Sequence, residues 1–102
     1  MIYKMFTVYD TAAKAYLPPF ILPHTGQAVR MFTECCNSKT HQFGKFPADY
    51  TLFLIARFDD STANLDLHTP EKIHNGLEVL DPDKFDEDIM YAHGPVEENE
   101  TN

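Results

Sequence analysis

The fold of this chain is decided by the stretch His41-Gln-Phe-Gly-Lys-Phe-Pro-Ala-Asp-Tyr-Thr-Leu-Phe-Leu-Ile-Ala-Arg-Phe-Asp-Asp-Ser-Thr-Ala-Asn-Leu65. Residues 50–58 within it are aromatic, aliphatic or β-branched with one basic exception, which predicts a strand. The polar residues 59–62 predict a turn, so residues 63–68 are expected to return as an antiparallel partner. The stretch therefore predicts a β-hairpin.

A compact aromatic loop, residues 42–47, leads into this hairpin. Proline fixes one backbone dihedral angle, so Pro47 is expected to set the direction in which the chain enters the strand. Phe46 and Tyr50 are expected to anchor the loop to the core.

Two extended segments precede the hairpin. Residues 2–9 are rich in β-branched and aromatic side chains and predict a strand. Residues 15–22 are also typical of extended backbone, but Pro18 and Pro19 cannot donate ladder hydrogen bonds. This segment is therefore expected to be an edge strand or an ordered arm.

One helix is predicted between these segments and the hairpin, over residues 26–37, with Thr25 as its N-cap. Its apolar residues recur at helical spacing and form a single stripe that should face the core: Ala28, Val29, Phe32, Cys35 and Cys36. One helix of this kind covers one face of a sheet.

The C-terminal part is less regular. Thr69 followed by Pro70 is typical of the start of a short helix, while residues 77–80 could equally form a last strand. From Asp81 onward the composition is acidic, which predicts a largely disordered tail over residues 81–102. The sequence as a whole predicts an α+β domain over residues 1–80, a small antiparallel sheet with one main helix on one face.

The net charge of −8 is distributed unevenly along the 102 residues. Residues 1–57 carry six basic and three acidic side chains, whereas residues 58–102 carry two basic and thirteen acidic ones. A mildly basic front half and a strongly acidic rear are typical of a protein with a nucleic-acid or protein partner.

Composition points to a reduced, cytoplasmic chain. The longest apolar run, residues 52–56, is far short of the roughly 20 residues that a membrane helix needs. The N-terminus lacks the long apolar segment of a signal peptide. Cys35 and Cys36 are adjacent, and neighbouring cysteines rarely form a disulfide with each other.

The sequence predicts no enzyme, metal or cofactor. The five histidines are scattered without metal-ligand spacing. Cys35, Cys36 and His41 could hold a soft metal, but closed sites normally use four ligands, so buried thiols are the favoured interpretation. No phosphate-binding glycine loop and no nucleophile motif is present.

The chain contains, in this order, the blocks Ala15-Tyr-Leu-Pro-Pro-Phe20, Gly26-Gln-Ala-Val-Arg-Met-Phe32, Gln42-Phe-Gly-Lys-Phe-Pro-Ala-Asp-Tyr-Thr-Leu-Phe53 and Phe58-Asp-Asp60. Together they resemble the small nonstructural protein of gokushoviruses, single-stranded DNA phages of the Microviridae. The likeness covers residues 3–80, whereas the acidic end from Asp81 matches no family pattern.

This resemblance implies a nonstructural, DNA-binding protein that acts in the host cytoplasm. Such a protein would help to switch double-stranded replication towards single-strand synthesis and packaging, with single-stranded DNA as its partner. The resemblance brings no residue-level assignment of DNA contacts, so the site residues below are inferred from this sequence alone.

Alternation along residues 50–58 predicts two apolar faces on one strand. One face would carry Leu52, Leu54, Ala56 and Phe58, and the other Thr51, Phe53, Ile55 and Arg57. Because one helix covers one face, the other face is expected to be partly bare.

Two interpretations explain a bare aromatic face. It could be buried in a homo-oligomer, or it could be a platform on which bases of single-stranded DNA stack. In the second case we expect stacking by Tyr3, Tyr9 and Phe53, and phosphate contacts by Lys4, Lys14, Arg30, Lys45 and Arg57.

The acidic rear half argues against tight, indiscriminate DNA binding by the whole surface. An alternative function is therefore an adaptor that recruits phage replication or capsid proteins without contacting DNA. A steep fall of DNA affinity with salt would separate the two functions, because only DNA binding releases counterions.

Overall fold

The computed structural model describes residues 1–82 of the chain. The elements run in the order β1 (Ile2–Asp10), β2 (Ala15–Tyr16), β3 (Phe20–Leu22), α1 (Thr25–Cys36), α2 (Gln42–Lys45), η1 (Pro47–Asp49), β4 (Tyr50–Asp59), β5 (Asn64–Asn75) and η2 (Gly76–Val79). The predicted tail lies outside the described residues from residue 83 onward.

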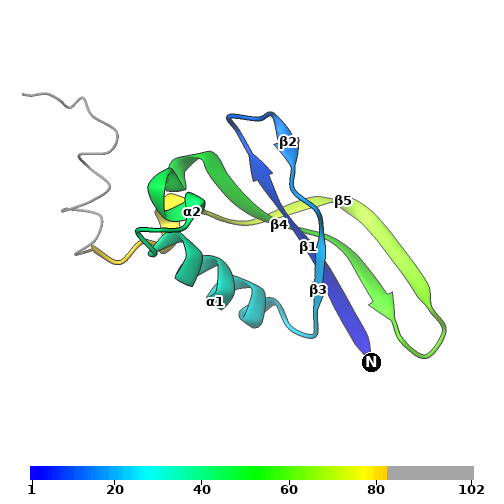
Figure 1. The fold of residues 1–102 in the computed structure, drawn as a ribbon. Coiled ribbons are helices and arrows are strands. Elements are labelled where there is room, and N and C mark those ends of the chain that lie inside the picture. The colour runs from blue at the N-terminus through cyan, green and yellow to red at the C-terminus, as the bar shows by residue number, and fades with distance from the viewer. Residues whose placement is uncertain (83–102) are drawn as a thin grey trace, which may run out of the picture.

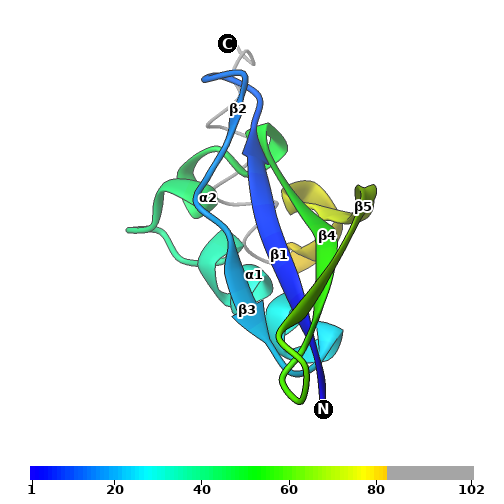
Figure 2. The same ribbon diagram turned by 90° about the vertical axis from the view of Figure 1, so that its right-hand side faces the viewer.

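The strands form one antiparallel sheet in the order β2-β1-β4-β5, with β3 also paired to β1. Figure 1 shows α1 on one side of this sheet and the β4–β5 hairpin extending past the helix. Seen from the side in Figure 2, the strands lie in front of α1. The predicted α+β class, with one main helix on one face, is confirmed.

The core lies between α1 and the sheet. Ala28, Phe32 and Cys36 are buried on α1 at intervals of four residues, as the predicted stripe requires. They pack against the buried strand residues Phe6, Val8, Tyr50, Leu52 and Leu54. Burying an aliphatic or aromatic side chain of this size contributes about 1.5–3 kcal/mol, so this cluster holds the helix on the sheet.

Helix α1 begins one residue earlier than predicted. His24 is the N-cap, with extended backbone, and its N–H donates to Gln27 Oε1 at 3.3 Å. The prediction of Thr25 as N-cap is wrong, because Thr25 already has helical backbone.

The aromatic loop contains the short helices α2 and η1. Its anchor is Phe43, whose ring lies 4.4 Å from Tyr50 and 5.7 Å from Phe32 between ring centroids. The prediction for Tyr50 is confirmed, since it is 3% exposed, whereas Phe46 is 49% exposed and does not anchor the loop.

Strand β5 is longer than the sequence indicates. Thr69 and Pro70 continue it instead of starting a helix, and residues 77–79 form part of the 3-10 turn η2. The register places Leu67 opposite Ala56 and Glu71 opposite Leu54, so residues 68–70 bulge opposite the single residue Ile55. A proline is tolerated at such a bulge of an edge strand because no ladder hydrogen bond is needed there.

A second bulge, in β4, changes which side chains share a face. Phe6 pairs with Leu54 but Met5 pairs with Ala56, which leaves Ile55 as an extra residue. Beyond it, Arg57 pairs with Lys4 and Phe58 with Tyr3. The predicted alternation therefore holds only up to Ile55, and the placing of Arg57 on the face of Phe53 is wrong.

We expect Gly44→Ala to destabilise the domain. A Cβ at Gly44 would collide with the backbone carbonyl of Ser38, and overpacking of this kind costs roughly 1–3 kcal/mol. The matched control is Gly26→Ala, since a Cβ at Gly26 meets nothing within 4 Å. Thermal unfolding of both variants tests this; an equal midpoint for the two would contradict the close packing of α2.

Candidate nucleic-acid interface

Three aromatic rings gather on the sheet face opposite α1. Tyr16 lies 4.8 Å from Tyr9 and 5.7 Å from Phe53 between ring centroids, so Tyr16 is the middle ring of the cluster. Tyr9 alternates along β1 with the core residues Phe6 and Val8, which places the cluster away from the helix. Tyr16 is 50% exposed and offers part of its ring to solvent. We call Tyr9, Tyr16 and Phe53 the aromatic cluster.

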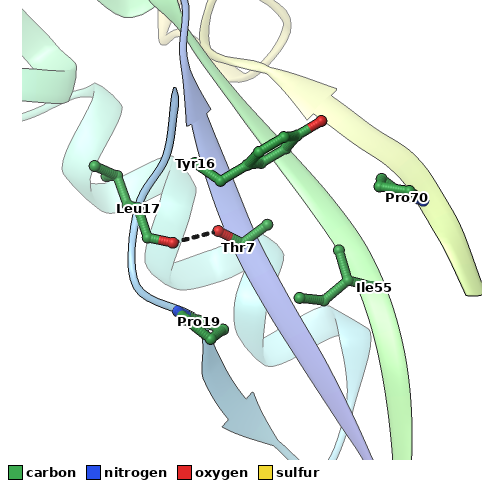
Figure 3. A pocket seen from close by; sticks show the side chains of 6 residues that line it. All are labelled: Thr7, Tyr16, Leu17, Pro19, Ile55 and Pro70. Atoms are coloured by element: carbon green, nitrogen blue, oxygen red, sulfur yellow. Dashed lines mark hydrogen bonds between the residues drawn. The ribbon is translucent and has the colours of Figure 1, made fainter. Parts of the chain in front are cut away.

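A pocket of about 250 Å³ adjoins the aromatic cluster through Tyr16. Figure 3 shows its lining side chains, which come from four segments of the chain: Thr7, Tyr16, Leu17, Pro19, Ile55 and Pro70. The Thr7 hydroxyl donates to the Leu17 carbonyl at 2.6 Å, so this polar side chain is already satisfied. The lining carries no charged residue.

The same face continues towards the β4–β5 turn as an apolar surface. Cross-strand partners share a face, and the register links Tyr3 to Phe58 and Phe58 to Leu65. Met5, two residues beyond Tyr3, pairs with Ile21. The most exposed members of this surface are Leu67 at 69%, Ile21 at 45% and Leu65 at 44%.

Two of the predicted phosphate ligands, Lys4 and Arg57, lie on the other face. Lys4 pairs with both Leu22 and Arg57, and Leu22 packs against the core cluster on the helix side. Arg57 also pairs with Asp66 and lines a hollow together with Asp59 and Asp66. The structure thus brings Lys4 and Arg57 together, but apart from the aromatic cluster and beside carboxylates.

The other three predicted cations are spread over the molecule. Lys14 is exposed in the turn between β1 and β2, with φ of 56°, two residues from Tyr16. Arg30 lies on α1, with its Nε 3.9 Å from Glu34 Oε2, and Lys45 is exposed at the end of α2. Of the predicted cations, Lys14 is therefore nearest in the chain to the aromatic cluster.

Lys72 would be a further cation beside the cluster, since it pairs with Phe53. Its Nζ donates to Glu78 Oε2 at 2.7 Å, and His74 Nδ1 lies 3.1 Å from Glu78 Oε1. Hydrogen bonds from Lys72 and His74 lower the pKa of Glu78 to about 2. Glu78 therefore compensates the charge of Lys72.

The sequence prediction named Tyr9 and Phe53 but missed Tyr16 and the pocket. The available signal was the four-residue polar turn, residues 11–14, which places Tyr16 opposite Tyr9 when the chain returns. Pro18 and Pro19 follow Tyr16 closely, and because prolines cannot donate ladder hydrogen bonds they indicate an edge without indicating that Tyr16 pairs with β1.

The two thiols belong to the helix and its core. Burial raises the pKa of Cys36 to about 12 and also raises that of Cys35. Within residues 1–82, no three His, Cys, Asp or Glu side chains come together in a way that could hold a metal ion. No helix in that part of the chain has the length and apolar character to cross a membrane.

Comparison with known proteins gives one match. The family model described as phage ORF5 protein matches residues 3–79, which include every described strand and helix except the first residue of β1, Ile2. No curated protein and no solved structure matches the chain.

The Glu78 contacts predict a pH-dependent difference in stability. The pKa of Glu78 is about 2 in the folded state against 4.5 for a free side chain. Its stabilisation is therefore complete above pH 4.5 and is lost as the pH falls towards 2. Glu78→Gln should lower the free energy of unfolding at neutral pH by at most about 1 kcal/mol, and the variant and wild type should converge near pH 2.

Urea unfolding at several pH values measures this difference. Glu71→Gln is the control, because Glu71 lies on β5 beside Lys72 and forms no ion pair within the described residues. A gap between wild type and Glu78→Gln that stays constant down to pH 2 would show that the charge of Glu78 does not contribute.

Proposed function

Because the chain belongs to the phage ORF5 protein family, we propose that it is a nonstructural phage protein that binds single-stranded DNA with modest affinity. Its role would lie in replication or packaging of a single-stranded DNA genome in the host cytoplasm, as a binding protein and not an enzyme. The likeness of residues 15–20, 26–32, 42–53 and 58–60 to gokushovirus proteins supports the single-stranded genome.

The observation that carries this proposal is the aromatic cluster. Its middle ring, Tyr16, has two further rings with centroids within 6 Å, and all three lie on a sheet face that α1 leaves uncovered. Every base has a π-face, so stacking on exposed rings needs no particular sequence, and each stacked base contributes on the order of 1–3 kcal/mol. The half-exposed ring of Tyr16 supports this use.

The charges favour modest affinity. Lys14 is the exposed cation closest in sequence to the cluster, and Lys72 is already engaged by Glu78. Lys4 and Arg57 project from the other face and would not contact the same strand of DNA. We therefore infer that stacking contributes more than phosphate binding. For each phosphate contact, the logarithm of the binding constant should fall by about 0.7 for every tenfold increase in salt concentration.

A second candidate function is a protein-binding adaptor, which the apolar surface beyond the cluster favours. Ile21, Leu65 and Leu67 are each more than 40% exposed on one face, and neighbouring exposed apolar side chains of this kind are typical of protein interfaces. The occupant we propose is a second copy of the chain, because two uncharged faces can meet without bringing the acidic side chains of either copy together. Phage replication or capsid proteins are the other partners proposed.

We expect Tyr16→Ala to weaken binding of a short single-stranded oligonucleotide about tenfold, because one stacking ring is lost. Fluorescence anisotropy at two salt concentrations measures the affinity. Tyr16 is half-exposed, so circular dichroism should show unchanged folding. Leu67→Ala, on the same face but outside the cluster, is the matched control and should bind like wild type.

The same titration tests the phosphate contact. Lys14→Gln should make the plot of log affinity against log salt concentration less steep, by the amount expected for one lost phosphate contact. Lys45→Gln, an equal change in charge at the end of α2, should leave the slope unchanged. Wild-type affinity and slope in folded Tyr16→Ala and Lys14→Gln would contradict DNA binding by this face and favour the adaptor.

Self-association is tested separately. Light scattering at high micromolar concentration should give a mass above that of the monomer, and Leu67→Asp should restore the monomer because it places a charge on the most exposed apolar side chain of the face. A wild-type protein that stays monomeric would contradict the homo-oligomer.

A further inference from the structure

We propose that the pocket beside the aromatic cluster holds one unstacked thymine base of the bound strand. This inference rests on the proposed DNA binding and goes beyond it, since it assigns a base preference to the pocket of Thr7, Tyr16, Leu17, Pro19, Ile55 and Pro70.

The lining excludes charged ligands. None of its six residues is charged. Its one buried hydroxyl, that of Thr7, already donates a hydrogen bond to the Leu17 carbonyl. A phosphate, carboxylate or ammonium group placed there would lose its water without finding a partner, which is strongly unfavourable. The uncharged part of a nucleotide, its base, suits this lining, and the pocket leaves the phosphate in solvent.

The volume admits a nucleic-acid base. At about 250 Å³ the pocket is smaller than the sites that hold drug-sized ligands. One planar base with its substituents enters such a space without displacing the lining side chains. The pocket is therefore large enough for a base of the bound strand.

The pocket adjoins the aromatic cluster, and this favours a nucleic-acid base as its occupant over an apolar side chain of a partner protein. Tyr16 is both the middle ring of the cluster and a wall of the pocket. In Figure 3 its ring extends across the face on the same side as Ile55 and Pro70. A strand whose bases stack on the cluster thus carries the next base directly to the pocket.

The apolar lining favours thymine. With no free hydrogen-bonding group among the side chains at its floor, the pocket can distinguish bases only by their apolar edges. A pyrimidine enters with its C5–C6 edge first and keeps its polar edge near solvent, and thymine alone adds a methyl group at C5. A purine would instead bring its N7 acceptor into an apolar space without a donor, which is unfavourable.

The test compares two oligonucleotides of equal length that differ only by this methyl group, oligodeoxythymidine and oligodeoxyuridine. Burial of one methyl group predicts about fourfold tighter binding of oligodeoxythymidine by the wild-type protein. Ile55→Phe places a larger side chain in the pocket and should remove the preference. Leu67→Phe makes a similar change outside the pocket and should keep it.

The outcomes separate the pocket from the proposed function. Equal affinity of wild type for the two oligonucleotides overturns the thymine pocket and leaves DNA binding intact, whereas absence of binding to both overturns both proposals. A preference that persists in folded Ile55→Phe would also overturn the pocket. If circular dichroism shows that Ile55→Phe does not fold, the wild-type comparison still decides.

Discussion

Strand β1 is hydrogen-bonded on both edges, to β4 along its whole length and to β2 and β3 on the other side. Because it is central, β1 positions β2, β3 and β4 directly, and β5 through β4. Its alternating side chains send Phe6 and Val8 into the core under α1 and Thr7 and Tyr9 to the open face. The core and the candidate interface are thus two sides of one strand, and neither can shift without the other.

The bulge at Ile55 divides the open face into two regions with different properties. On one side of it lie the aromatic cluster and the pocket, and on the other side the apolar surface of the β4–β5 hairpin. An uninterrupted ladder would have put Arg57 on the open face, beside the aromatic rings. The extra residue instead turns Arg57 towards Lys4 and the carboxylates of Asp59 and Asp66. The separation of Arg57 from the rings therefore follows from a single backbone irregularity.

How much the sequence could predict depends on whether the signal was local. The helical stripe and the apolar run of β4 are local patterns, and both gave the correct element. Thr69 and Pro70 are typical of a helix start, yet pairing of β5 with β4 prevailed, since the ladder outweighs a weak local preference. The bulge has no local signature, so the face of Arg57 could not be predicted. Tyr9 and Phe53 followed from alternation, whereas Tyr16 and the pocket depend on how distant segments return to β1.

The pairing of β1 with β4 also has a consequence for the order in which the protein folds. The first strand of the chain finds its main partner only in residues 50–59, and α1 lies between them in sequence. Contacts between such distant segments are slow to form because a long loop must close first. During synthesis, the apolar residues of β1 have only the short strands β2 and β3 to pair with until β4 has left the ribosome. We therefore expect helix α1 to form early and the sheet to assemble around it late.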